Sequence, residues 1–200
     1  MKRTLVIQAG GESQRMGQNK ALMSFCGETL LHRVLRRVSG LADELLITAQ
    51  QPESLQSFGL PVIADIFPGK GPLGGLYTAL ATAANADVIV VACDMPFVNP
   101  HLLLAECELL LTTRADAVVP LSPLGLEPLH AVYRRDVCLA AVKKALDAGQ
   151  LRLSAWFSAI RVRQMALEEV AQYDPDFHAF INVNSPLEYQ QAEDLARQIE

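Results

Sequence analysis

Residues 4–20 read TLVIQAGGESQRMGQNK, and this stretch decides the class of fold that the chain can adopt. An apolar run at residues 4–7 predicts a buried strand, which leads directly into a loop with three glycines, Arg15 and Lys20. Glycines let backbone N–H groups approach an anion closely, and the two cations neutralise phosphate charge. The stretch therefore predicts a strand followed by a triphosphate-binding loop, and with it a role in nucleotide chemistry.

Two commoner phosphate-binding loops do not fit this stretch. The P-loop requires G-x-x-x-x-G-K-S/T, but the spacing from Gly11 to Gly17 is one residue too long and Lys20 comes three residues after Gly17. The dinucleotide fingerprint requires G-x-G-x-x-G, whereas Gly10 and Gly11 are adjacent. A surface loop with chance charges is the simpler alternative, and the position directly after the first strand argues against it.

Composition and charge narrow the class of protein. Of the 200 residues, 50% are hydrophobic and 20% are charged, which suits a soluble protein with a substantial core, and we expect a single domain over residues 1–200. The formal net charge of −5 argues against a general binder of duplex nucleic acid. No apolar stretch approaches the length of a membrane span or a signal-peptide core. We therefore expect a cytoplasmic protein with neither nucleic-acid nor membrane partners.

The four cysteines are far apart and include no C-x-x-C pair, which argues against zinc or iron–sulfur ligation. Nothing in the sequence suggests secretion. We therefore expect free and mostly buried thiols in a reducing compartment. The cysteines are Cys26, Cys93, Cys107 and Cys138.

Short apolar runs alternate with helical patterns along the chain, which indicates an α/β architecture. The predicted strands are residues 4–8, 44–48, 61–64, 87–92 and 117–120. The predicted helices are residues 29–39, 74–84, 100–112, 135–148 and 186–199. The region 125–180 is less regular: we expect strands at 129–133, 160–165 and 180–182, with some antiparallel pairing.

Local signals support several of these helices. Asn99 and Ser185 each precede a proline, which fits an N-cap followed by proline at the first helical position. Gly149 fits a helix stop after Ala148.

Three later motifs accompany the glycine loop. G-P-L-G-G-L at residues 71–76 is a second glycine motif, A-C-D-M-P-F at 92–97 contains a C-D-x-P turn, and N-V-N-S-P lies at 182–186. Together with A-G-G-x-S-x-R-M-G-x-x-K at residues 9–20, they resemble the molybdenum cofactor guanylyltransferase family of nucleotidyltransferases (pyrophosphorylases). The four motifs occur in family order and span nearly the whole chain. The resemblance implies a three-layer αβα Rossmann-like nucleotidyltransferase fold with a mostly parallel sheet.

The resemblance also implies a reaction, in which an acceptor phosphate attacks the α-phosphorus of a nucleoside triphosphate and pyrophosphate leaves. Charge spreads over the phosphoryl oxygens in the transition state, so positioning and electrostatic stabilisation do most of the catalysis. The acceptor phosphate is already nucleophilic at neutral pH, so no general base is needed. The sequence offers no evident Ser/His/Asp set, because its four histidines are scattered.

Asp94 is the first candidate for catalysis. It lies just after the predicted strand 87–92, at the carboxyl end of a parallel sheet, where ligands bind in this class of fold. A lone carboxylate there suits Mg²⁺, which keeps several waters and takes substrate phosphates as ligands. Capping of the helix at Pro100 is the alternative role, and Asn99 is better placed for it. By resemblance, Asp94 is a catalytic, nucleotide-binding and Mg²⁺-binding residue.

Arg15 and Lys20 are the other catalytic candidates, and we expect both to contact the phosphates. The resemblance places the nucleotide against the start of the loop, which comprises Gln8, Ala9, Gly10 and Gly11. Gln8 stands where the family commonly has Leu, and we expect its side chain to touch either the nucleotide or the strand edge.

Three further residues are expected to face the nucleoside. Asp65 follows the predicted strand 61–64, where the family has an Asp that contacts base or ribose; a capping or turn role is equally compatible with the sequence. Thr48 stands where the family has Asn, so the polar contact that this Asn makes in the family is altered here. Gly74 leaves room for a base or ribose against the backbone, although packing glycines at a helix N-terminus give the same pattern.

The acceptor side rests on residues near the C-terminus. Asn182 and Asn184 precede the last predicted helix, and by resemblance they support the acceptor phosphate or the metal; we favour Asn182, because Asn184 also suits a turn. His130 lies in a segment that resembles one facing the acceptor, but a lone His beside an apolar strand is more often a packed residue. We expect residues 1–120 to bind the nucleotide and residues 121–200 the acceptor.

The resemblance thus implies transfer of GMP from GTP to molybdopterin, with Mg²⁺ as cofactor. The pair Gly10–Gly11 is the guanylyl pattern, whereas related cytidylyltransferases usually carry Ala-Gly. A cytidylyltransferase for the same acceptor, another small phosphate-acceptor nucleotidyltransferase and a non-catalytic cofactor-delivery chaperone stay open as alternatives. Apo-molybdoenzymes or delivery chaperones are expected partners.

Overall fold

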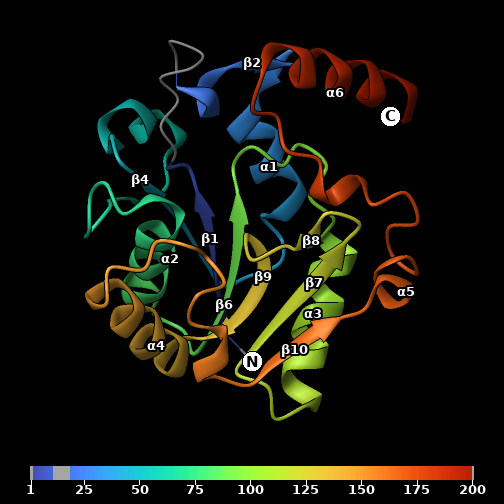
Figure 1. Cartoon of the computed structure of the whole chain (residues 1–200). Coiled ribbons are helices and arrows are strands. Elements are labelled where there is room, and N and C mark those ends of the chain that lie inside the picture. Colours follow the sequence, from blue (N-terminus) through green and yellow to red (C-terminus); the bar gives the residue numbers. More distant parts are fainter. Residues whose placement is uncertain (1, 11–18, 200) are drawn as a thin grey trace.

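A computed structural model of the protein describes residues 2–10 and 19–199. Its core is an eight-stranded sheet in the order β10-β7-β9-β6-β1-β4-β5, with β8 paired to β7 (Figure 1). Strands β6, β1, β4 and β5 run parallel to one another, and so do β7 and β10, whereas β9 lies between β6 and β7 and is antiparallel to both. The predicted mostly parallel sheet is confirmed. The strands are β1 Arg3–Gln8, β4 Glu44–Ala49, β5 Val62–Ala64, β6 Asp87–Ala92, β7 Ala117–Ser122, β8 Gly125–Leu126, β9 His130–Arg134 and β10 Val162–Met165.

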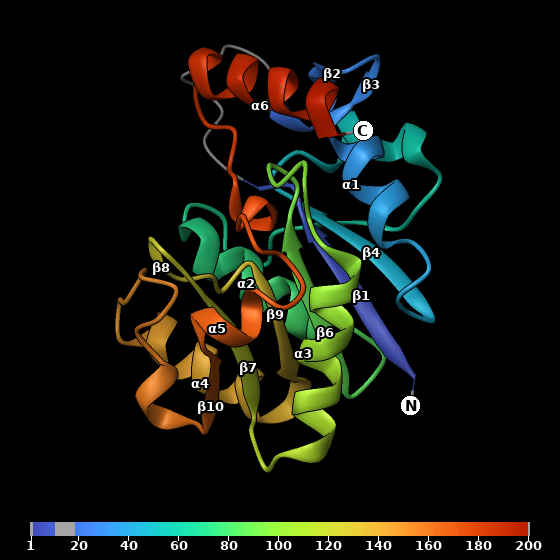
Figure 2. The same cartoon turned by 90° about the vertical axis from the view of Figure 1, so that its right-hand side faces the viewer.

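Helices cover both faces of the sheet and make the fold three-layered (Figures 1 and 2). Helices α1 and α3 pack on one face, and α2 and α4 on the other. The long helices are α1 Leu30–Val38, α2 Gly71–Thr82, α3 Pro100–Thr112, α4 Arg135–Asp147 and α6 Pro186–Ile199. The short elements are η2 Lys20–Leu22, β2 Ser24–Phe25, β3 Glu28–Thr29, η3 Pro52–Phe58, η4 Phe157–Ala159, α5 Leu167–Val170 and η5 His178–Phe180.

Strand β6 forms the middle of the core because both of its faces are covered. All six of its residues are buried. Val88 and Val90 pack with α2 and α4, while Ile89 and Val91 pack with α1 and α3. A β-branched run of this kind is typical of a parallel strand between two helix layers, and the structure places it between β1 and β9.

Helix α6 lies apart from these two layers, across the end of the sheet where the parallel strands terminate (Figure 2). It packs on the β2–β3 hairpin and on the start of α1 through a small apolar cluster that includes Phe25, Leu30 and Ala192. The hairpin was not predicted. Its two-residue turn, Cys26-Gly27, has positive φ at both positions, the backbone of a type I′ turn.

Two helix ends follow the sequence signals closely. Asn99 Oδ1 accepts hydrogen bonds from the backbone N–H groups of His101 and Leu102, which confirms Asn99 as the N-cap of α3. Gly149 has φ of 74° directly after the end of α4. All four cysteines are free, and three of them are buried, as expected. Among the described residues, no helix combines the length and apolar character that a bilayer crossing requires.

The strand predicted at residues 180–182 is wrong. The carboxylate of Asp174 accepts hydrogen bonds from the N–H groups of His178 and Ala179, and this fixes the short helix η5 instead. Phe177, which precedes η5, has a left-handed backbone with φ of 56°. The antiparallel pairing predicted for region 125–180 is confirmed by β8 and β9.

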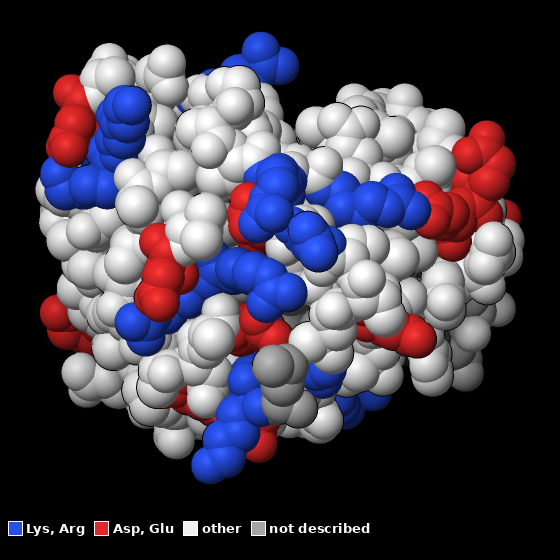
Figure 3. All heavy atoms as spheres, turned by 90° about the horizontal axis from the view of Figure 1, so that it is seen from below, with Lys and Arg blue, Asp and Glu red and all other residues white. Residues whose placement is uncertain are grey.

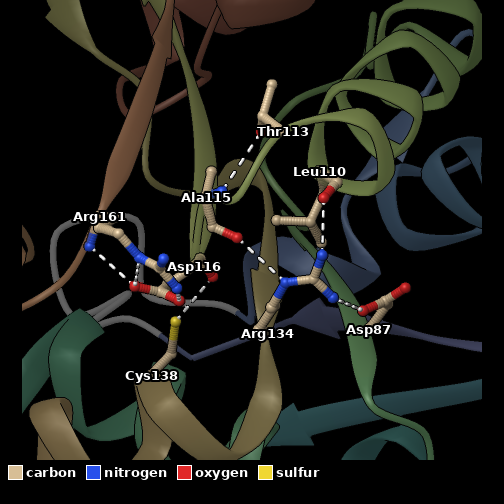
Figure 4. A network of polar contacts seen from close by, with 8 residues as sticks. All are labelled: Asp87, Leu110, Thr113, Ala115, Asp116, Arg134, Cys138 and Arg161. Carbon is tan, nitrogen blue, oxygen red and sulfur yellow. Dashed lines mark hydrogen bonds and ion pairs between the residues drawn. The ribbon is translucent and has the colours of Figure 1, made fainter.

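The opposite end of the sheet, where the parallel strands begin, carries many charged side chains of both signs (Figure 3). A partly buried network of polar contacts lies at this end of the sheet (Figure 4). Arg134 donates to the carbonyls of Ala115 and Leu110 and to Asp87 Oδ1. Asp116 Oδ1 accepts from Arg161 Nη2 at 2.8 Å, and its Oδ2 accepts from the backbone N and from Nε of the same arginine. These bonds join β6, β7 and β9 to the end of α3 and the start of β10.

Asp116→Asn should lower the melting temperature by a few degrees at pH 7. The hydrogen bonds from Arg161 hold the pKa of Asp116 below its usual range, so their stabilisation is present above the ordinary Asp pKa of about 3.9 and is lost as pH falls through the lowered value. The gap between wild type and variant should therefore shrink below about pH 4. Thermal unfolding, followed by circular dichroism at pH values from 7 to 3, measures this difference in melting temperature. A gap that stays constant over this range would contradict the assignment, and Asp136→Asn, on the exposed α4 surface, should change little.

Candidate active site

The carboxyl ends of the parallel strands bring most of the predicted site residues to one edge of the sheet, the edge beneath α6 in Figure 1. Ala9 donates its N–H to the carbonyl of Thr48, which joins the end of β1 to β4. Asp65 follows β5, and a Cβ added to Gly10 would lie 3.5 Å from its Oδ2. Arg15 and Gly11 lie outside the described residues, so their predicted phosphate and nucleotide contacts stay predictions.

Lys20 is positioned by a short capped helix. Asn19 Oδ1 accepts from the N–H of Ala21, which is buried, and Asn19 Nδ2 donates to Ser54 Oγ on η3. Lys20 Nζ donates to Asn184 Oδ1 at 2.7 Å and lies 3.8 Å from Asp94 Oδ2. Two of the three predicted catalytic residues are therefore neighbours, and Asn184 completes the group.

Asp94 is held by the turn that follows β6. Arg33 Nε donates to the carbonyl of Pro96 at 2.9 Å, and its guanidinium lies over the rings of Phe25 and Phe97. The backbone carbonyl of Asp94 accepts from the N–H of Val183 at 3.0 Å, which brings the C-terminal motif against the turn. These two bonds fix the backbone at Asp94 and just after it.

Burial is the main influence on the acidity of Asp94. The side chain is 23% exposed, and the protein atoms around it desolvate the carboxylate enough to raise its pKa. The charge of Lys20 opposes this rise, and that of Glu188 adds to it. Glu188 was missed in the sequence, although Ser185-x-x-Glu188 has the spacing of a capping box. Its Oε2 accepts a hydrogen bond from the backbone N–H of Asn184, and this bond lowers the pKa of Glu188. The same bond holds Asn184 in the position where it contacts Lys20.

A cavity of about 460 Å³ opens beside this group. Asn184, which contacts Lys20, and Glu188, which contacts Asn184, also line the cavity. The rest of its lining is largely apolar. Asn182 also lines the cavity, but its Nδ2 donates to the carbonyl of Phe180, so Asn184 and not Asn182 contacts Lys20. The lining residues are Ser122, Pro123, Leu124, Phe177, Phe180, Ile181, Asn182, Asn184 and Glu188.

His130 lies behind one wall of the cavity. It is fully buried, its ring is 5.3 Å from that of Phe180, and its Nδ1 is 3.0 Å from Glu106 Oε1. Burial raises the pKa of Glu106 to about 7, against the influence of His130. The reading of His130 as a packed residue is therefore confirmed. Glu106 gave no signal in the sequence, because α3 reads as an ordinary apolar helix.

The nucleoside candidates surround the first turns of α2. Gln8 and Thr48 are buried, and both point from adjacent strands toward this helix. Asp65 is partly buried, and desolvation raises its pKa. A Cβ on Gly74 would lie 2.9 Å from the carbonyl of Phe67, so the protein's own packing already requires glycine there. The predicted contact of Gly74 with a nucleoside stays a prediction.

The donor set at Asp94 suits a hard divalent cation. No group of three or more His, Cys, Asp or Glu side chains that could hold a metal occurs in the described ranges. A single partly buried carboxylate with an amide oxygen nearby matches Mg²⁺, which retains waters and takes its other ligands from phosphates. Lys20 then provides a second positive charge for the same phosphates.

A glycine loop after the first strand, a lysine and a strand-end carboxylate beside a cavity together define a site of the nucleotidyltransferase class. In agreement, the model of the MobA-like NTP transferase domain family matches residues 5–165. The chain belongs to this family.

Relatives cover almost the whole chain. The probable molybdenum cofactor guanylyltransferase of Pelotomaculum thermopropionicum is 35% identical over 98% of this chain and 94% of its own length. The molybdenum cofactor guanylyltransferase of Desulfosudis oleivorans is 32% identical over 95% and 94%. The crystal structure of molybdopterin-guanine dinucleotide biosynthesis protein A from Archaeoglobus fulgidus aligns with a TM-score of 0.86 at 25% identity, covering 98% of this chain and 100% of that one.

Asp94→Asn should raise the melting temperature at pH 7 in buffer without nucleotide or divalent cation. Because the folded protein raises the pKa of Asp94, stability is lost as pH increases from the ordinary value through the raised one, and an uncharged amide avoids this loss. The gain should vanish below about pH 4, where the wild-type carboxyl is also neutral. Thermal unfolding at pH 7 and pH 3.5 measures the effect. A lower melting temperature for the variant at pH 7 would show that the carboxylate stabilises the fold instead.

Proposed function

We propose that the protein transfers GMP from GTP to molybdopterin, forming molybdopterin guanine dinucleotide and pyrophosphate with the help of Mg²⁺. The observation that carries this proposal is the contact of Lys20, the last residue of the glycine motif, with Asn184 and Asp94 beside the cavity. Family membership supports the reaction class, and the names of the relatives in Pelotomaculum and Desulfosudis support the substrates.

In this mechanism an oxygen of the acceptor phosphate forms a bond to the α-phosphorus of GTP. The bond from the α-phosphorus to the bridging oxygen breaks, and pyrophosphate leaves with that electron pair. Asp94 and Asn184 would hold Mg²⁺, which supplies neutralising charge to the triphosphate when it is bound. Lys20 and, by resemblance, Arg15 stabilise the charge that develops on the phosphoryl oxygens.

The cavity is the proposed acceptor site. All of its lining residues come from positions after 121, the part of the chain expected to bind the acceptor. Phe177, Phe180 and Ile181 offer apolar surface to a flat ring, and Asn182 offers an amide to its polar edge. The volume lies within the range of small-molecule sites. A pterin bound here would direct its phosphate toward Lys20, because Asn184 joins the cavity to that lysine.

The nucleoside would lie at the other end of the site, between the backbone of Ala9 and Gly10 and helix α2. Ala9 and Gly10 provide backbone, and Asp65 provides a carboxylate oxygen with no hydrogen-bond partner in the described residues. Such an oxygen accepts N–H donors from a base or O–H donors from a ribose. Thr48 contributes a hydroxyl where relatives of this class carry an amide.

Thermal unfolding with Mg²⁺ and each of GTP, CTP, ATP and UTP tests the nucleotide. A ligand at about 100 times its dissociation constant stabilises the folded state by roughly 2.7 kcal/mol, which corresponds to a shift of about 5–10 °C for a chain of this size. We expect this shift with GTP alone. A shift with CTP alone would favour the cytidylyltransferase alternative, and a response to none of the four would contradict nucleotide transfer.

Asp94→Ala should reduce the Mg²⁺-dependent transfer of GMP to molybdopterin by at least about 100-fold, because the triphosphate loses its metal anchor. Lys20→Ala should weaken GTP binding. Pyrophosphate release and product chromatography measure the activity, and calorimetry measures the binding. The matched control is Asp147→Ala, which removes an exposed carboxylate that is also paired with a lysine, Lys143 on α4. Near-normal transfer by folded Asp94→Ala would refute the role of this carboxylate.

A further inference from the structure

Gln8 carries a buried amide whose orientation is fixed. The residue ends β1, is 3% exposed and points toward α2. Its Nε2 donates to the backbone carbonyl of Pro72 at 3.0 Å. A carbonyl can only accept, so the nitrogen must be the atom that faces Pro72, and the amide oxygen Oε1 must face away from it.

The amide lies flat against Gly75. A Cβ at position 75 would be 2.3 Å from Gln8 Nε2 and 2.6 Å from its Cδ, so a side chain there would force the Gln8 amide to move. Glycine at this position therefore creates the space that Gln8 fills. The side chain is enclosed between β1 and α2, which leaves it little rotational freedom.

The amide oxygen of Gln8 has no hydrogen-bond partner among the described residues, and it shares this feature with two neighbours. Thr48 Oγ1 and Asp65 Oδ1 are also buried and unpaired. Gln8 and Thr48 are in register on adjacent parallel strands, and strand alternation places Asp65, directly after β5, on the same face. Most buried polar atoms have a partner. Three such atoms at the carboxyl edge of the sheet, next to Gly10, point to a ligand that supplies hydrogen-bond donors.

We propose that Gln8 is a specificity-determining residue, whose amide oxygen accepts a hydrogen bond from the 2-amino group of guanine. This assignment rests on the proposed use of GTP. Guanine differs from the other bases by an amino donor at position 2, which lies beside its N1–H donor. Oε1 of Gln8 and Oδ1 of Asp65 are two acceptors on one face of the sheet, on either side of β4, and in this assignment they face these two donors. Adenine, cytosine and uracil each offer only one donor group on the corresponding edge.

Inosine triphosphate isolates this contact, because it is GTP without the 2-amino group. Calorimetry should give wild-type protein a dissociation constant for GTP about 5- to 10-fold lower than for inosine triphosphate, the value of one hydrogen bond. In Gln8→Met, which keeps the length of the side chain and removes the amide, this ratio should fall to about 1. Gln8→Leu also removes the amide but has a branched side chain, so the same fall in the ratio would show that the amide and not the side-chain shape is responsible.

The neighbouring residue on the same strand gives a matched control. Ile7 is fully buried and packs on the opposite face of the sheet, away from α2, so Ile7→Val should lose some stability and keep the wild-type ratio. A ratio that is unchanged in folded Gln8→Met and Gln8→Leu would overturn the role of Gln8, while GTP binding itself would still support the proposed function. If wild-type protein binds neither nucleotide, the proposed function fails and this assignment fails with it.

Discussion

The desolvated carboxylate of Asp94 is the constraint around which the site is arranged. A buried charge is costly unless a partner lies close to it. Here the partner is Lys20, 3.8 Å away, which a capped turn of η2 and the amide of Asn184 hold in position. Asn184 is held in turn by Glu188 at the start of α6. The N-terminal loop, the end of β6 and the last helix are thus joined through one charged group, although they are far apart in the sequence.

The turn that carries Asp94 is rigid for reasons outside the site. Arg33 is only 1% exposed, and the arginine of an ordinary amphipathic helix would face solvent. It instead donates to the Pro96 carbonyl between two aromatic rings, and Arg37 donates to the carbonyl of Val98. Helix α1 therefore directly supports the turn that carries Asp94. These hydrogen bonds hold the Asp94 carboxylate in a partly desolvated position, which a freely moving carboxylate would leave for water.

The sequence predicts the main strands and helices well because their signals are local. The β-branched run of β6, the Asn99–Pro100 cap and the position of Gly149 need no knowledge of the rest of the chain. The expected strand at 180–182 fails because Asp174, several residues upstream, provides a competing set of hydrogen bonds. The short β2–β3 hairpin is too brief for any periodicity to reveal it.

For the site, the sequence indicates Asp94, which follows the end of β6, and Lys20, which ends the glycine motif. It does not indicate which asparagine meets Lys20, because the choice depends on how residues 182–184 bend when Val183 bonds to the turn at Asp94. The buried pair of Glu106 and His130 is equally hidden, since it joins α3 to β9 across 24 positions. Contacts of this kind depend on the packed structure and leave no periodic trace.

Gln8 shows how such a packed contact can change the chemistry of a site. A polar residue at the end of a buried strand would ordinarily destabilise the core unless both ends of its amide were paired. The fold pairs the nitrogen with Pro72 and uses Gly75 to make room, but the oxygen has no partner within residues 2–10 and 19–199. An unpaired oxygen weakens the empty protein and strengthens the complex with any ligand that brings a donor. Under the proposed assignment of Gln8, the stability lost in the free state would be recovered as affinity and selectivity when the nucleotide binds.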